Sequence, residues 1–562
     1  MGKSIRLNGH IQITPLINAY IFFFYFSGLT HILLQLLGTT IFLGLRQAIY
    51  MSFLWLIPIL LFPQKTKLIS GTIGLVLWVS SLISIGYFCI YQQEFSQSVL
   101  FVIFESNPAE SQEYIAQYFR WWMAPVFLGH TLVAFWLWKR IKPIQGTLGA
   151  RVLISLLAFA LTIGSPLFKD YIVKKRPLDV ALEKLQMRME PAQPWQLVMG
   201  FIQYQKQLAN MQALLERNSK LPPLENLTQK NAELPSTLVL VIGESTNRGH
   251  MNLYGYQRET TPNLNKIRNE LTVFKKVVSP RPYTIEALEQ VLTFADQEHP
   301  ELVMTKPSLM NMMKQAGYKT YWITNQQTLT KRNTMLTTFS KQMDVQKYMN
   351  NSRAQNSREY DENVFAPFQE ALNDSAKRKF IVIHLLGTHM KYDYRYPESF
   401  EKFKGDDGLD KKFNDSQLTY INSYDNAVLY NDFVVSELIN FTKKQDSRSL
   451  LVYFSDHGED VYDSPPYEML GRNEGRPTTP MYTVPFMIWQ SNQWKVTDGR
   501  DLSKFTERPY STSHFIYTWA DLVGITFKYF DATKSLVSNA FIKRPLLIGD
   551  PEAKGKLQEI HQ

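Results

Sequence analysis

Residues 450–459 read Leu-Leu-Val-Tyr-Phe-Ser-Asp-His-Gly-Glu, an apolar run typical of a strand that ends directly in aspartate, histidine and glycine. Two other apolar runs end in a similar way. Leu238–Ile242 is followed by Gly-Glu-Ser-Thr at 243–246, and Phe380–Ile383 is followed by His-Leu-Leu-Gly-Thr-His at 384–389. Binding sites of parallel sheets collect beyond the carboxyl ends of the strands. We therefore expect these three strand ends to meet in one site.

The chain from Thr237 onward alternates such apolar runs with helical patterns. Thr320–Ile323 and Val484–Trp489 are further strand candidates, and Ser308–Gln315 and Asp425–Lys443 have helical spacing. Strands that alternate with helices predict an α/β domain around a central, mainly parallel sheet.

The first third of the chain is apolar and predicts an α-helical transmembrane domain. A spanning helix needs roughly 20 apolar residues. Five stretches qualify: Leu16–Leu37, Ile49–Phe62, Leu68–Ile90, Trp121–Trp138 and Val152–Phe168. The second is short, and we expect it to extend upstream through Ile41–Leu45. We expect five spans over residues 1–170, bridging amphipathic helices and a linker over 171–236, and a catalytic domain over 237–562. Buried core helices of a soluble protein are the alternative, which five such runs disfavour.

The charges of the short loops predict the orientation of these spans. The loop after the second span carries Lys65 and Lys67, and the loop after the fourth is basic as well, whereas residues 91–118 contain four glutamates and neither lysine nor arginine. Because basic loops stay in the cytoplasm, the part after the fifth span lies outside. In a Gram-negative bacterium this is an inner-membrane protein with a periplasmic catalytic domain.

The segment between the two domains has two separate patterns. Residues 192–217 are amphipathic with helical spacing, which predicts either an interfacial helix on the bilayer or a helix packed against the soluble domain. Leu221–Ser236 is polar and contains three prolines, which is typical of a linker.

The overall composition limits the classes of binding partner and the kinds of metal site that the chain can have. The net charge of +10 suits an anionic membrane surface or an anionic substrate. Nucleic acid is disfavoured because no helix-turn-helix, RNP-like or zinc-finger pattern occurs. Cys89 is the single cysteine, so intramolecular disulfides and a cysteine-ligated metal are excluded.

The candidate site combines carboxylates, histidines and a hydroxyl. Glu244, Asp456 and His457 are oxygen and nitrogen ligands that suit zinc, with manganese as the weaker alternative. Thr284 stands where a helical pattern begins, either as a plain N-cap residue or as a hydroxyl nucleophile beside the metal. His389 is a candidate for holding a phosphate or for protonating a leaving group, whereas His384 continues its strand and is expected in the core.

Together these motifs resemble the membrane-bound phosphoethanolamine transferases of the alkaline-phosphatase and sulfatase superfamily. The segments that carry the resemblance are Val-Ile-Gly-Glu-Ser-Thr at 241–246, Tyr-Gly-Tyr-Gln-Arg-Glu-Thr-Thr-Pro-Asn at 254–263, Thr284, Gly-Thr-His at 387–389 and Ser-Asp-His-Gly-Glu at 455–459. Segments 93–101, 307–318 and 470–474, and the lack of disulfides, favour the branch that modifies the lipopolysaccharide core.

The resemblance implies a zinc site of Glu244, Thr284, Asp456 and His457, with Thr284 as the nucleophile. It also implies phosphatidylethanolamine as the donor, a phosphoethanolamine-threonine intermediate, and a heptose of the lipopolysaccharide core as the acceptor. His389 would bind or protonate the substrate, and Asn325 is a further candidate for the substrate pocket.

Two departures from the family pattern and several alternatives stay open. Many relatives have disulfides in this domain, and many place a second substrate-binding histidine before the last strand, but residues 462–484 contain no histidine. Lipid A or a periplasmic glucan could be the acceptor instead. A membrane-anchored phosphodiesterase or sulfatase-type hydrolase is the rival activity, although the Cys/Ser-x-Pro-x-Arg motif of sulfatases does not occur near Thr284. A scaffold with a degenerate enzyme domain is disfavoured, because all four ligand types are present.

Overall fold

The computed structural model describes residues 6–7, 11–36, 42–91, 119–202, 205, 221–326, 339–350, 359–551 and 557–561. The chain divides into two compact units, Met1–Leu208 and Ala209–Gln562. Each unit has its own hydrophobic core, and the two are described separately.

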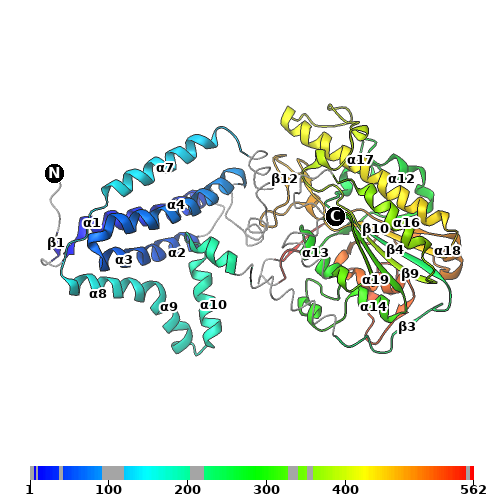
Figure 1. Ribbon diagram of the computed structural model, residues 1–562, viewed down its shortest axis with the longest axis horizontal. Coiled ribbons are helices and arrows are strands. Elements are labelled where there is room, and N and C mark those ends of the chain that lie inside the picture. Colours follow the sequence, from blue (N-terminus) through cyan, green and yellow to red (C-terminus); the bar gives the residue numbers. More distant parts are fainter. Residues whose placement is uncertain are drawn as a thin grey trace. The chain divides into compact units, whose positions relative to one another are not determined.

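The first unit is helical, as the apolar N-terminal third predicts (Figure 1). Its helices are α1 (Ile13–Leu36), α2 (Phe42–Ser52), α3 (Leu56–Leu61), α4 (Thr66–Tyr91), α7 (Met123–Arg140), α8 (Leu148–Phe159), α9 (Ser165–Leu167) and α10 (Leu178–Met189). Two wider π-helical turns, Ala160–Gly164 and Phe168–Val173, continue α8 and α9 into one long helical rod.

Four helices of this unit are long and apolar enough to cross a membrane, where the sequence predicted five. They are Ile13–Leu33, Gly44–Leu61, Pro63–Ile90 and Leu148–Val173. The remaining predicted span is helix α7, whose buried His130 and terminal Lys139 and Arg140 make it more polar than the others. The acidic loop expected at 91–118 lies outside the described residues apart from Tyr91.

The amphipathic region at 192–217 is described only at its beginning, where residues 195–202 are helical. Trp195 stacks on Trp55 of the first unit, with ring centroids 5.5 Å apart and planes within 10° of parallel. Val198 and Phe201 of the same helical stretch are 40% and 46% exposed. This beginning therefore packs on the helical unit and keeps an apolar face uncovered.

The second unit is built around a seven-stranded sheet with the order β5-β13-β10-β4-β9-β7-β8 (Figure 1). The bounds are β5 (Leu271–Phe274), β13 (Phe486–Gln490), β10 (Ser449–Ser455), β4 (Ser236–Gly243), β9 (Arg378–His384), β7 (Lys319–Thr324) and β8 (Val345–Tyr348). The five strands from β10 to β8 are mutually parallel, whereas β13 is antiparallel to both of its neighbours. The sheet is therefore mixed, where the sequence predicted a mainly parallel one.

Helices cover both faces of this sheet. The central strand β4 is therefore buried along its whole length, and its side chains alternate between the two faces. Leu238, Leu240 and Ile242 face a core shared with α13 (Thr284–Val291), α14 (Leu309–Gln315) and α19 (Phe515–Leu522). Val239 and Val241 face the opposite core, which includes α16 (Phe365–Asn373) and the long α17 (Asp415–Lys444). The short helices α12 (Pro262–Lys266) and α18 (Asn492–Asp498) complete the unit.

The segment expected as a linker, Leu221–Ser236, belongs in part to the folded second unit. Its residues Thr228–Gln229 form β3, which pairs with β15 (Ile525–Thr526), and Leu224 is buried in the core. The other two-residue strands are β1 (Arg6–Leu7), β2 (Ile11–Gln12), β6 (Val277–Val278), β11 (Asp460–Val461), β12 (Leu470–Gly471), β14 (Tyr510–Ser511), β16 (Leu547–Ile548) and β17 (Gln558–Glu559).

Candidate active site

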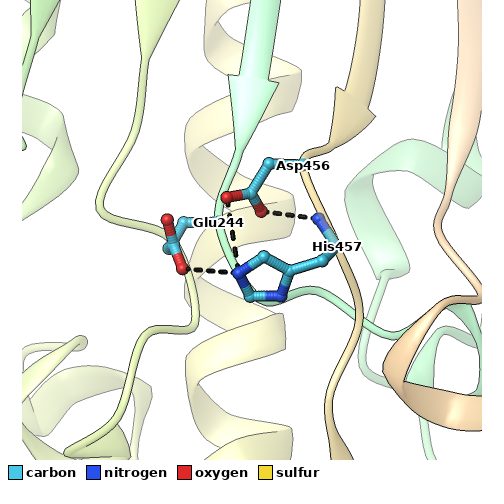
Figure 2. A group of neighbouring side chains, drawn as sticks. All are labelled: Glu244, Asp456 and His457. Carbon is cyan, nitrogen blue, oxygen red and sulfur yellow. Dashed lines mark hydrogen bonds and ion pairs between the residues drawn. The ribbon is translucent and has the colours of Figure 1, made fainter. Parts of the chain in front are cut away.

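Neighbouring parallel strands bring the predicted ligands together. In the register of β4 and β10, Gly243 lies opposite Ser455, so that Glu244 and Asp456 are the first residues after the ends of these strands. The Asp456 N–H also donates to the Gly243 carbonyl at 3.1 Å. Figure 2 shows the two carboxylates and the His457 ring facing one another. All three side chains are buried, and one ligand atom from each lies within 4.8 Å of the others.

Thr284 joins this group as its fourth member. Its Oγ1 donates to Glu244 Oε2 at 2.8 Å and lies 3.4 Å from His457 Nε2. His457 Nε2 is in turn 3.2 Å from Glu244 Oε1 and 3.4 Å from Asp456 Oδ2. The four residues that the sequence singled out for the metal therefore form a single cluster.

The helix that carries Thr284 begins at this residue, as its pattern predicts, but Thr284 is not the cap. Tyr283 has extended backbone angles and holds the N-cap position of α13, and its carbonyl accepts from Ala287 at 2.9 Å. The plain N-cap interpretation is wrong for Thr284, because its hydroxyl is directed to Glu244 instead of to the helix backbone.

Two glycines allow the backbone to pass close to the ligands. A Cβ on Gly458 would lie 2.2 Å from the Pro480 carbonyl oxygen, so the chain can leave β10 here only without a side chain. Gly387 has a φ of +56°, and a Cβ there would lie 2.7 Å from the Glu244 carbonyl oxygen. Both positions favour glycine for steric reasons, and Gly387 favours it for conformational reasons as well.

The charges of the cluster are strongly coupled because all its members are buried. Burial would raise the pKa of Glu244, but the hydrogen bond and charge of His457, with His389 and Arg472, hold this pKa well below its usual value. Burial and the negative charge of Glu244 raise the pKa of Asp456 well above its usual value. Burial and the charge of Arg472 lower the pKa of His457. Two close carboxylates and an imidazole are a ligand set for a divalent cation.

The donor set and its spacing fit zinc. Ligand atoms about 2.0–2.1 Å from a tetrahedral ion lie roughly 3.3 Å from one another. The contacts of Thr284 with Glu244 and His457, and of His457 with Glu244 and Asp456, are 2.8 to 3.4 Å long. Asp456 Oδ1 accepts two backbone N–H groups, whereas Oδ2 is buried without a hydrogen-bond partner among the described residues. Glu244, Thr284, Asp456 and His457 could therefore hold the ion.

His389 lies on the loop after β9. This loop is hydrogen-bonded to the backbone of Glu244. The N–H and the hydroxyl of Thr388 both donate to the Glu244 carbonyl, at 3.0 and 3.1 Å. His389 Nδ1 donates to the Met390 carbonyl at 2.6 Å, which places the proton of the neutral ring on Nδ1. When Nε2 is protonated as well, the positive charge of the ring helps to lower the pKa of Glu244.

Asn325 does not contact the cluster directly. Its Nδ2 donates to Asp361 at 2.9 Å, and Asp361 accepts from the backbone N–H groups of Leu386 and Gly387. Asn325 thus supports the loop that carries His389. The neighbouring Gln326, which sequence reasoning missed, donates from Nε2 to Glu244 Oε2 at 3.2 Å. Its position two residues after the end of β7 was the available signal.

Arg472 is the second functional candidate that the ligand pattern did not reveal. Its Nη1 lies 2.7 Å from His457 Nε2 and 3.5 Å from Glu244 Oε1. His384 lies in the core, as expected, and burial lowers its pKa to about 4.

The chain is similar to known proteins. Residues 236–525 match the sulfatase family. The chain is 50% identical over 546 residues to phosphoethanolamine transferase EptC of Escherichia coli strain K12, which covers 96% of this chain and 94% of that protein. The crystal structure of the C-terminal periplasmic domain of E. coli EptC, in complex with Zn, is 55% identical with a TM-score of 0.59, and covers 60% of this chain and 96% of that domain.

A likeness in fold extends over both units. The integral membrane lipooligosaccharide phosphoethanolamine transferase A of Neisseria meningitidis has a TM-score of 0.62, covering 95% of this chain and 99% of that one, at 19% identity.

Proposed function

Because this chain belongs to the phosphoethanolamine transferases with a sulfatase-type domain, we propose that it transfers phosphoethanolamine from phosphatidylethanolamine to the lipopolysaccharide core. The observation that carries the proposal is the hydrogen bond of 2.8 Å from Thr284 Oγ1 to Glu244, inside a buried cluster of metal-ligand type. A threonine hydroxyl is a poor nucleophile by itself, and this environment is suited to activate it.

Zinc is the metal that we assign to Glu244, Thr284, Asp456 and His457. When bound, it would supply the positive charge that lowers the pKa of the Thr284 hydroxyl. The zinc complex of the E. coli domain, at 55% identity, supports this choice.

The first half of the reaction forms a phosphoethanolamine-threonine intermediate. Thr284 Oγ1 attacks the phosphorus of the donor, the bond from Oγ1 to phosphorus forms, and the bond from phosphorus to the diacylglycerol oxygen breaks. Glu244 Oε2 accepts the hydrogen bond of the attacking hydroxyl and is placed to take its proton. The diacylglycerol oxygen takes a proton as it leaves, for which His389 is the candidate donor.

The second half returns Thr284 to its starting state. A hydroxyl or phosphate of a core heptose attacks the same phosphorus and passes its proton to His389. The bond from phosphorus to Thr284 Oγ1 breaks, and Oγ1 takes back the proton held by Glu244. Asn325 contributes indirectly by holding Asp361 and, through it, the loop of His389.

We place the protein in the bacterial inner membrane with the second unit in the periplasm. Four candidate spans and the position of the donor in a bilayer support this placement, and α7 would be the fifth span that brings the second unit outside.

Mass spectrometry of lipopolysaccharide tests the proposal, with core and lipid A analysed separately from cells that express the wild type, Thr284→Ala or no protein. We expect a phosphoethanolamine-sized increment on the core with the wild type alone. An increment on lipid A or on a periplasmic glucan would keep the chemistry and change the acceptor. Hydrolysis of the donor without any transfer would replace the proposal by a phosphodiesterase.

A further inference from the structure

Arg472 enters the site from a segment that carries none of the four metal-ligand candidates. It directly follows β12 (Leu470–Gly471), which pairs with β11 (Asp460–Val461) just beyond the Asp-His-Gly turn. Its side chain is only 12% exposed. Its Nη1 lies 2.7 Å from His457 Nε2, and its Nε lies 3.8 Å from Glu459 Oε1. A buried arginine that faces a metal-ligand cluster needs a reason, because desolvation of a cation is costly.

The Arg472 segment is tied to the segment of the nucleophile. Two residues after Arg472, Glu474 accepts two hydrogen bonds from Arg281, at 2.6 and 3.1 Å. Both side chains of this pair are about nine-tenths buried, at 9% and 11% exposure. Arg281 stands three residues before Thr284, so this ion pair fixes the position of Arg472 relative to the attacking oxygen.

The Arg472 N–H group that points at His457 could donate to a different acceptor when a metal is bound. His457 Nε2 has one lone pair, and Nε2 is the atom of this ring that faces both carboxylates of the cluster. A cation that takes this lone pair releases Arg472 Nη1 for another acceptor. Glu459 does not replace it, because its ion pair of 3.8 Å is longer than a hydrogen bond.

An anion beside Thr284 is the partner that this geometry suits. A guanidinium presents N–H donors in a planar fork that matches two oxygens of a phosphoryl group. The segment between residues 462 and 484 holds no histidine that could do the same. We propose that Arg472 binds the phosphoryl oxygens of the donor phosphodiester and neutralises the charge that grows on them while Thr284 attacks.

This inference rests on the proposed function for its substrate, but its test has a separate readout. The full chain, purified in detergent and loaded with zinc, is prepared as wild type, Arg472→Lys, Arg472→Gln and Arg476→Gln. Arg476→Gln removes the same charge from an exposed position of the same segment and is the matched control. Zinc content is measured for every variant, binding of inorganic phosphate by calorimetry, and release of diacylglycerol from phosphatidylethanolamine by a fluorescent acyl label.

We expect Arg472→Gln to lower the rate of diacylglycerol release by about 10²- to 10³-fold, the range for a lost donor to a developing oxyanion. Phosphate binding should weaken on the order of tenfold or more, with zinc content unchanged. Arg472→Lys should recover part of both, because it keeps the charge without the fork. The Arg476→Gln control should match the wild type.

Unchanged phosphate binding in Arg472→Gln would overturn the inference, and so would a loss of zinc, which would make Arg472 a support of the metal site. If the wild type releases no diacylglycerol, the proposed function fails, and the comparison of phosphate binding still decides the role of Arg472.

Discussion

Gly387→Ala should damage the proposed active site through the backbone of Glu244, a proposed metal ligand. Gly387 has a φ of +56°, and an added Cβ would lie 2.7 Å from the carbonyl oxygen and 2.8 Å from the nitrogen of Glu244. The left-handed backbone costs a side chain about 1–2 kcal/mol. Overpacking against a rigid neighbour costs about 1–3 kcal/mol more. We therefore expect a loss of roughly 2–5 kcal/mol in the free energy of unfolding, with Glu244 displaced.

Two other glycines allow the cost of the left-handed backbone to be measured separately from the cost of overpacking. Gly255 has a φ of +104° and no neighbouring atom within 4 Å of an added Cβ, so Gly255→Ala should pay only the conformational cost. Gly405 lies outside the left-handed region and has equally open space, so Gly405→Ala should be close to neutral.

The assay is denaturant unfolding of the full chain in detergent for all three variants, together with bound zinc per chain. We expect stability to fall in the order Gly405→Ala, Gly255→Ala, Gly387→Ala, and zinc content to fall only in Gly387→Ala. Equal stability of the Gly255 and Gly387 variants, with full zinc content in both, would refute the argument that this glycine is required by the approach to Glu244.

Three further changes have defined outcomes. Asp456→Asn should abolish zinc binding yet raise the melting temperature of the metal-free protein, because it removes one of two close buried carboxylates; a lower melting temperature would contradict this. His250 is buried, which lowers its pKa, but Asp425 and Asp463, at 2.6 and 2.9 Å, raise it more, to about 10 from 6.5. The protonated His250 therefore stabilises the folded protein fully below pH ~6.5, and this contribution is lost towards pH ~10, by at most about 1.4 kcal/mol per pH unit. The urea midpoint should fall between pH 7 and pH 9 in the wild type, and it should fall less in His250→Gln. Arg281→Met leaves its carboxylate partner buried and unpaired, so we expect a loss of about 3–5 kcal/mol in urea unfolding, and a loss below about 1 kcal/mol would show that the pair is dispensable.

Sequence patterns predicted those parts of the fold that bury a regular face. The strands around 238–242, 380–383 and 450–454 are continuous apolar runs because they lie in the middle of the sheet with helices on both sides. The edge strands β5 and β8 were missed. Val-Gln-Lys-Tyr in β8 is partly exposed and has no such run, so only its pairing with β7 makes it a strand.

The metal-ligand candidates could be predicted for a related reason. Glu244 and Asp456 follow strands directly, and the strand register alone brings them together. Gln326 and Arg472 could not be placed with the same ease. The contact of Gln326 with Glu244 depends on a side-chain direction that hydrophobic periodicity does not predict. The position of Arg472 depends on the pairing of two-residue strands and on the ion pair of Glu474 with Arg281.

The strand order has a consequence for how this protein is made. β4 lies between β10 and β9, yet β10 is synthesised more than two hundred residues after β4, so that one edge of β4 waits unpaired for most of the synthesis of the unit. Folding with such a high contact order is slow and favours a late, concerted step. Asp456 and His457 arrive with β10 itself. A metal bound by Asp456 and His457, as we propose, would therefore be taken up by a chain that is nearly complete, and it would stabilise the finished sheet without guiding its early assembly.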